Sequence, residues 1–392
     1  MITELLRKPF SRRVFTRMLG ALIAGAAVLR VPVGAHAQAV SQKQAVSQTQ
    51  AASQTQTSSQ PLAQRASRHG PVSRIAFGSC VDQDKPQPIW DVVNSAKPDV
   101  FVFLGDNIYG DSEDPAVLQS KYEQLGAVPG FQQLRQQTDV VAIWDDHDYG
   151  VNDGGLEYPS KEASRQVMLD FFGEPADSER RSRPDGIYTS YVYGEPGNTV
   201  QIILLDLRWN RTALHEVADA DKRASRLAQD MGPYDASLEP GATMLGEAQW
   251  QWFQQQLHVE ADLRIIGSSI QLLADFTGWQ TWANFPADRQ RFFNLLHTSP
   301  MVPTVIISGD THWSEFSRID NSGLPFPLVE MTSSGLTEEW QAISPNRHRI
   351  GEAFARANVG MIDIDWSVQP PAVTMQIRDV QGAVLIDRRV EF

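Results

Sequence analysis

Short apolar runs recur along most of this chain, and they limit its fold more than any other feature. They are rich in β-branched residues and are separated by turns or by stretches with helical spacing. Such runs are typical of strands that are buried on both faces of a sheet, because neither face then needs polar side chains. The predicted strands cover residues 74–77, 100–104, 140–144, 200–205, 264–266, 302–307, 328–331, 359–364 and 372–377.

Patterns of helical period lie between many of these runs, at residues 89–96, 116–125, 162–172, 247–257 and 287–296. Alternation of strands and helices predicts an α/β fold whose sheets are covered by helices. The last strands follow one another without a long helix, which predicts antiparallel pairing there. No long linker interrupts residues 71–392, so we expect them to form one domain.

The first 37 residues have the pattern of an export signal. Basic residues precede an apolar run at residues 19–29, and Ala35-His36-Ala37 follows as a cleavage site. The run is 11 residues long, whereas a membrane span needs about 20, so we expect no integral membrane span. Residues 11–17, Ser-Arg-Arg-Val-Phe-Thr-Arg, resemble a twin-arginine signal, with an ordinary secretory signal as the alternative. The pattern predicts a periplasmic or secreted protein with the twin-arginine export machinery as a partner.

Residues 38–70 have the composition of a spacer. Three copies of a six-residue pattern rich in Ser, Gln, Ala and Thr occupy residues 39–56. These residues offer too little apolar surface to offset the entropy lost on ordering. A β-helix of six-residue repeats is the alternative, but three polar copies are too few for one.

Charge and cysteine content exclude several classes of protein. The chain has 34 Lys and Arg against 47 Asp and Glu, a net charge of −13. The remainder is more acidic still once the basic export signal is removed, which argues against binding to nucleic acid or to anionic lipid surfaces. A single cysteine rules out a disulfide framework and a multi-cysteine zinc site.

Polar side chains cluster where the predicted strands end. Cys80 follows the run at 74–77, and Asp310 and His312 follow the run at 302–307. Because ligands bind outside the carboxyl ends of strands in open α/β sheets, these groups could build one metal site. Taken singly, a Gly-Asp step is often a turn, a lone cysteine is often a small buried apolar residue, and an Asp-rich stretch is often a solvated loop. Their coincidence at several strand ends favours a shared metal site.

Four motifs resemble those of the PhoD-like (alkaline phosphatase D) family of metallophosphoesterases. They are Phe-Gly-Ser-Cys at 77–80, Gly-Asp-Asn-Ile-Tyr at 105–109, Trp-Asp-Asp-His-Asp at 144–148 and Gly-Asp-Thr-His-Trp at 309–313. The resemblance implies a calcineurin-like metallophosphatase, with two mixed β-sheets sandwiched together and flanked by helices, and makes residues 71–392 the catalytic domain. The sequence departs from the family at Asn107, where many members have Tyr, and lacks the extra N-terminal β-domain of larger members.

The resemblance also implies a role for each site residue. It makes His147 the catalytic histidine, Arg208 a catalytic phosphate clamp and Asn107, with Arg208, a substrate-binding residue. An arginine after a strand is as often a surface ion-pair partner. The implied metal ligands are Cys80, Asp106, Tyr109, Asp146, Asp310 and His312. Gln271 lies near the position of a ligand histidine in related phosphatases.

The chemistry of these side chains is consistent with iron and calcium, the metals that the resemblance implies. A tyrosine has a reference pKa of about 10, so a tyrosinate ligand at neutral pH requires a strongly polarising cation such as Fe³⁺. A thiolate is a soft ligand that alkaline-earth ions do not favour. Surplus carboxylates are hard donors suited to Ca²⁺. Those carboxylates belong to Asp106, Asp145, Asp146, Asp148 and Asp310.

We therefore expect an exported phosphoesterase for phosphate scavenging, which hydrolyses phosphomonoesters, phosphodiesters or both with a metal-bound hydroxide. Its substrates would be small-molecule or lipid phosphate esters. Two alternatives stay open, namely a phospholipid-cleaving phosphodiesterase and a non-catalytic metal or phosphate binder on the same fold.

Overall fold

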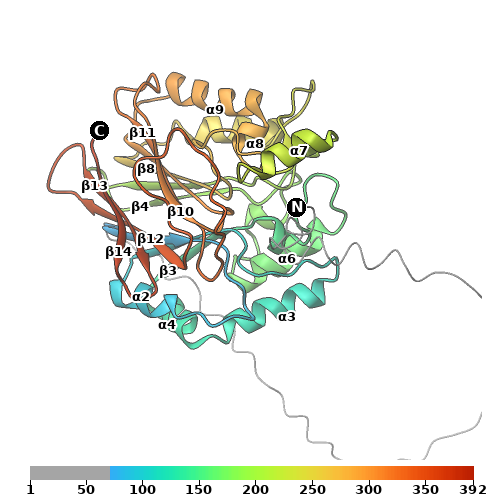
Figure 1. Cartoon of the computed structure of the whole chain (residues 1–392). Helices are drawn as coiled ribbons and strands as arrows, with labels where there is room; N and C mark the ends of the chain where they lie inside the picture. The colour runs from blue at the N-terminus through green and yellow to red at the C-terminus, as the bar shows by residue number, and fades with distance from the viewer. Residues whose placement is uncertain (1–70) are drawn as a thin grey trace, which may run out of the picture. The chain divides into compact units, whose positions relative to one another are not determined.

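The computed structural model describes residues 71–392 (Figure 1). The predicted export signal at 1–37 and spacer at 38–70 lie outside the described residues. Within residues 71–392, every helix falls short of the length and apolarity that crossing a bilayer requires.

Two six-stranded mixed sheets form the centre of the fold. In the first sheet, β1, β2 and β3 are parallel, and β12 pairs with β1 in the antiparallel sense. Antiparallel pairs β12–β13 and β13–β14 extend it, as predicted for the last strands. The order is β14 (Val384–Val390), β13 (Ala372–Asp379), β12 (Asn358–Asp365), β1 (Arg74–Gly78), β2 (Val100–Leu104) and β3 (Asp139–Ile143).

In the second sheet, four central strands are parallel and both edge strands pair in the antiparallel sense. The order is β10 (Ser314–Ile319), β11 (Leu328–Ser333), β9 (Thr304–Ser308), β8 (Leu263–Ser268), β5 (Val200–Leu204) and β4 (Thr189–Tyr193). A small separate pair joins β6 (His215–Glu216) to β7 (Tyr234–Asp235).

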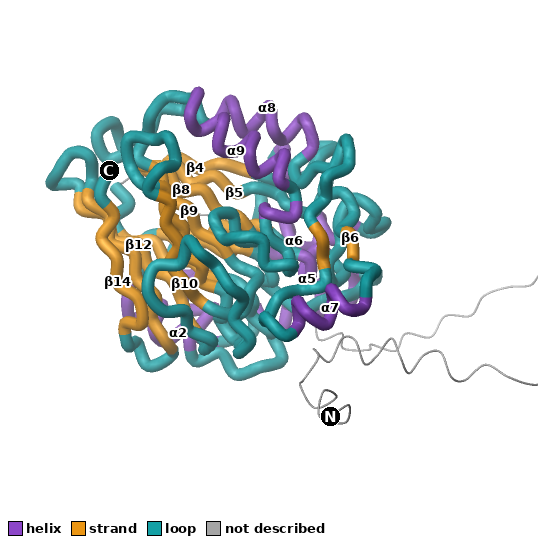
Figure 2. The backbone as a smooth tube through the Cα atoms, turned by 45° about the horizontal axis from the view of Figure 1, so that its top comes forward, coloured by secondary structure: helices purple, strands orange, loops and turns teal. Residues whose placement is uncertain are grey.

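Helices cover the outer faces of the two sheets (Figures 1 and 2). Those on the first sheet include α2 (Ile89–Ala96), α3 (Pro115–Gly126) and α4 (Pro129–Gln137), and those on the second are α8 (Gly246–Gln256) and α9 (Pro286–Thr298). The remaining α-helices are α5 (Asp146–Tyr149), α6 (Lys161–Phe171) and α7 (Ala220–Leu227).

Alternation along each strand separates an inner and an outer core. On β2, the rings of Phe101 and Phe103 lie 5.5 and 6.0 Å from Trp90 of α2, on the outer face. Leu104 points the other way and packs against Gly267 of β8, where an added Cβ would lie 3.0 Å from it. The two sheets therefore pack face to face, which confirms the predicted calcineurin-like sandwich.

Several elements were not predicted. Strand β10 has the sequence Ser-Glu-Phe-Ser-Arg-Ile, which lacks an apolar run. It is buried nevertheless, because Glu315 accepts hydrogen bonds from Gln271 and Arg349. Helix α4 begins with Pro129-Gly130, a pair that resembles a turn, although proline fits the first turn of a helix.

Candidate metal centre and active site

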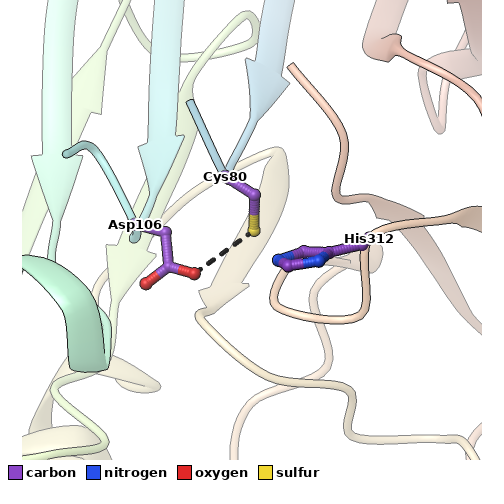
Figure 3. A group of neighbouring side chains, drawn as sticks. All are labelled: Cys80, Asp106 and His312. Carbon is purple, nitrogen blue, oxygen red and sulfur yellow. Dashed lines mark hydrogen bonds between the residues drawn. The ribbon is translucent and has the colours of Figure 1, made fainter. Parts of the chain in front are cut away.

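The predicted ligands gather at one edge of the sandwich, where parallel strands of both sheets end. Cys80 follows β1, Asp106 follows β2, Asp146 opens α5 after β3, and Asp310 follows β9. Figure 3 shows the side chains of Cys80 and Asp106 turned toward His312. The sulfur of Cys80 lies 3.5 Å from Oδ2 of Asp106.

Asp106 is common to three groups of side chains whose ligand atoms lie within 4.8 Å of one another. Asp106 therefore lies where the three groups meet. The groups are Cys80, Asp106 and His312, then Asp106, Asp146 and His147, and lastly Asp106, Asp145, Asp146 and Asp310.

The backbone is left-handed at four of these residues. The φ angles are 63° at Cys80, 48° at Asp106, 72° at Asp310 and 63° at His312. Each such conformation costs roughly 1–3 kcal/mol for a residue other than glycine and persists where the surrounding structure imposes it. The strain falls on the residues that would bind metal, so the loops are shaped to aim these side chains inward.

Burial makes this cluster of acids electrostatically unfavourable without a cation. Burial and the neighbouring Asp146 carboxyl raise the pKa of Asp106 well above its usual range. Burial and Asp145 do the same to the pKa of Asp310, and burial and Asp106 raise the pKa of the Cys80 thiol. One carboxylate oxygen, Oδ2 of Asp145, is buried with no hydrogen-bond partner among the described residues. A thiol, an imidazole and repelling carboxylates fit bound metal ions, which would favour the deprotonated ligands.

Tyr109 lies beside both histidines of the site. Its hydroxyl is 3.0 Å from Nε2 of His312, and its ring centroid is 4.4 Å from that of His147. Tyr109 and His312 are half-buried, whereas Cys80 and Asp106 are fully buried. Tyr109 therefore stands on the solvent side of the cluster, within reach of the group that contains His312.

Asp148 fixes the loops that carry the candidate ligands through four hydrogen bonds. Its Oδ1 accepts hydrogen bonds from the backbone N–H of Asp106 and of Asp145, at 3.2 and 2.7 Å. Its Oδ2 accepts from Asn107 Nδ2 at 2.5 Å and from the Tyr122 hydroxyl at 3.2 Å. The suggestion that Asp148 is a surplus calcium ligand is therefore wrong, because protein donors occupy both oxygens.

Asn107 is fully buried, and its amide nitrogen donates to Asp148 and to the carbonyl of Ile143. Asn107 is next to the candidate ligand Asp106 in the chain, but its amide nitrogen is already hydrogen-bonded to other groups of the protein.

Arg208 is fully buried, so the alternative that it is a surface ion-pair partner is wrong. Its Nε lies 2.5 Å from Oδ1 of Asp145, and its Nη1 donates to Gln280 at 2.6 Å. Its Nη2 is 3.9 Å from Oδ1 of Asp146. Arg208 therefore places a positive charge against the buried carboxylates.

Sequence reasoning missed Asp111, which contacts the predicted catalytic histidine. Oδ1 of Asp111 lies 2.6 Å from Nδ1 of His147. The Asp111 side chain is 42% exposed and that of His147 only 3%, so the pair links the buried site to its rim. Gln271, by contrast, donates to Glu315 and Thr332 within a buried network.

A family model described as PhoD-like phosphatase matches residues 75–386. The chain belongs to the PhoD-like phosphatase family. It is 25% identical over 228 residues to alkaline phosphatase D of Bacillus subtilis, an alignment that covers 50% of this chain and 36% of that relative. The chain thus matches little more than a third of the relative's length.

Two solved structures share the fold at low sequence identity. A structure of PhoD aligns with a TM-score of 0.59 at 16% identity, covering 83% of this chain and 72% of that one. GAP50, described as the anchor in the inner membrane complex of Plasmodium, aligns with a TM-score of 0.51 at 11% identity, covering 82% of this chain and 89% of the other. The sandwich is therefore shared by family members and by a protein described as an anchor.

Proposed function

We propose that this PhoD-like protein is an exported, metal-dependent phosphoesterase that hydrolyses phosphomonoesters, phosphodiesters or both and thereby releases phosphate for uptake. One observation carries the proposal: Asp106 is shared by three potential ligand groups in a buried, repelling cluster of acids. The chain belongs to a phosphatase family, and the backbone of several candidate ligands is strained. Both facts support a cluster that binds metal for catalysis.

The ligand types favour two different metals. We assign iron, as Fe³⁺, to the group of Cys80, Asp106 and His312, with Tyr109 beside it. A tyrosinate requires a strongly polarising cation, and a thiolate favours a transition metal over an alkaline-earth ion. The oxygen donors of Asp146 and Asp310 with Asp106 suit Ca²⁺. Bound metals would supply the polarisation of water and the neutralisation of phosphoryl oxygens that phosphoester hydrolysis requires.

The protein's own groups have complementary roles in this proposal. Asp111 fixes the ring of His147 through Nδ1, so that His147 can present its other nitrogen to the leaving oxygen and donate a proton. Arg208 holds Asp145 in place, and its Nη2 is the part of the guanidinium that could contact a phosphoryl oxygen. We assign Asn107 to fixing Asp148 rather than to binding substrate.

The proposal is tested with p-nitrophenyl phosphate and bis-p-nitrophenyl phosphate as substrates. The cleaved, exported protein is assayed with calcium, with and without chelator. We expect turnover of at least one substrate that chelator abolishes, and the ratio of the two rates assigns monoesterase or diesterase character. Absence of turnover from protein shown to contain metal would contradict the proposal and favour a metal or phosphate binder.

The role of Asp111 gives a separate prediction. Asp111→Asn should lower kcat by about 10- to 100-fold, because the amide no longer orients the imidazole as the carboxylate does. KM and the metal held by Cys80, Asp106 and His312 should change little, since neither Asp111 nor His147 belongs to that group. Asp114→Asn is the matched control, an exposed helix-capping aspartate three residues away. Equal kcat for both variants would remove Asp111 from the mechanism.

A further inference from the structure

Two tryptophans from different loops meet beside the metal cluster. Trp279 lies between β8 and α9, and Trp340 lies between β11 and β12. Their ring centroids are 6.0 Å apart at an interplanar angle of 77°, an edge-to-face contact. Both side chains are half-buried, so part of each indole faces solvent. The pair therefore offers an angled apolar surface, made of two nearly perpendicular rings.

Backbone and side-chain contacts join each tryptophan to a site residue. The N–H of Trp340 donates to the carbonyl of His312 at 2.9 Å. Trp279 precedes Gln280, whose side chain accepts from Arg208 at 2.6 Å and donates to Asp153. The pair thus stands at the rim of the site, between the loop of His312 and the side chains that hold Arg208.

A third segment, residues 230–234, fixes the two loops. The N–H of Tyr234 donates to the carbonyl of Gly278 at 2.9 Å, and the hydroxyl of Ser344 donates to the carbonyl of Asp230 at 2.6 Å. Gly278 has a φ of 75°, and a Cβ there would lie 2.5 Å from the Gly232 carbonyl oxygen, so the backbones touch. The tryptophans therefore belong to a preorganised wall, which binds a ligand with little loss of entropy.

The exposure of the site residues indicates where the organic part of a substrate would lie. Cys80 and Asp106 are fully buried, whereas Tyr109, Asp310 and His312 are half-buried. A phosphoryl group at the cluster must therefore enter from the side of Tyr109 and His312. The backbone N–H of Trp340 donates to the carbonyl of His312, which places this residue next to that entry.

We propose that Trp279 and Trp340 form the binding wall for a planar aromatic leaving group, so that the enzyme prefers aryl phosphoesters to esters of aliphatic polyols. Aromatic rings gain from edge-to-face or offset contact with indole, whereas a hydrated polyol does not. This inference rests on the proposed phosphoesterase function and specifies its substrate class.

The test compares phenyl phosphate with glycerol 2-phosphate in wild type, Trp279→Ala and Trp340→Ala at matched metal content. We expect kcat/KM for phenyl phosphate to fall by about three- to tenfold in each variant, with glycerol 2-phosphate within about twofold of wild type. Trp279→Phe and Trp340→Phe should retain most of the preference. Trp366→Ala is the control, because Trp366 bonds Val72 before β1, at the end of that strand opposite Cys80.

A binding measurement keeps the inference separable from the catalytic proposal. Phenylphosphonate should bind more tightly than methylphosphonate to wild type, and the two alanine variants should lose that difference. If the two alanine variants lose kcat/KM equally on both ester substrates, the inference is wrong. It is also wrong if these variants keep the preference for the phenyl compound in both binding and turnover. If wild type hydrolyses neither ester, the catalytic proposal fails, and the phosphonate comparison still decides whether the wall binds aromatic groups.

Discussion

An Asp106→Asn variant is expected to lose more than about a hundredfold in kcat/KM, together with most of its bound metal. Asp106 is the carboxylate shared by all three ligand groups, so an amide there weakens every potential metal position at once. Replacing a group that only supports a ligand already costs about 10- to 100-fold in affinity or activity. The measurement is steady-state turnover with elemental analysis of the same samples.

The same variant should be at least as stable as wild type once metal is removed. Burial and neighbouring carboxyls raise the pKa of Asp106, which means that its charge is unfavourable in the folded metal-free protein. An amide of the same shape removes that repulsion. Metal should then raise the melting temperature of wild type but not of Asp106→Asn. Asp320→Asn, at an exposed ion pair, is the control. A variant that keeps its metal would contradict Asp106 as the shared ligand.

Arg208→Met is expected to lower the free energy of unfolding of metal-free protein by about 3–5 kcal/mol. Arg208 is fully buried against Asp145, and removing one partner of a buried pair leaves the other charge uncompensated. Asp146 and Asp310 are the other acidic groups that favour the charged form of Arg208 and so raise its pKa. Urea unfolding of stripped wild type and variant measures the difference.

Arg291→Met is the matched control, because Arg291 pairs with Glu247 at the surface. Its loss should be about 0–1 kcal/mol. If Arg208→Met unfolds like the control yet loses affinity for inorganic phosphate, the arginine acts as a substrate clamp and its structural role is refuted. A large loss of stability supports the role of holding Asp145.

The gathering of the candidate metal ligands could be predicted from sequence because they lie close to the ends of their own strands. Cys80 is two residues beyond β1, Asp106 two beyond β2, and Asp310 two beyond β9. Parallel neighbours such as β1 and β2 have their carboxyl ends at the same edge of a sheet. The packing of the second sheet on the first then brings the end of β9 to the same place. The family motifs indicate which strand ends form the site. The two-sheet fold was predicted because most strands are apolar runs, whereas β10 lacks such a run and was missed.

The supporting residues could not be predicted, because they meet through loops. Asp111 reaches His147 across 36 positions of sequence, and Gln280 reaches Arg208 across 72. No local pattern marks either contact. Asp148 lies inside a recognised motif, yet only the structure shows that both its oxygens accept protein donors and that it positions Asp106 and Asp145.

Bound metal and turnover, measured on the same samples during stepwise chelation, test the central claim most directly. The claim is that the cluster around Asp106 binds metal and that this metal is required for phosphoester hydrolysis. We predict that hydrolysis of p-nitrophenyl phosphate or bis-p-nitrophenyl phosphate falls together with the metal content and returns when metal is restored. Full turnover by metal-free protein would contradict the account.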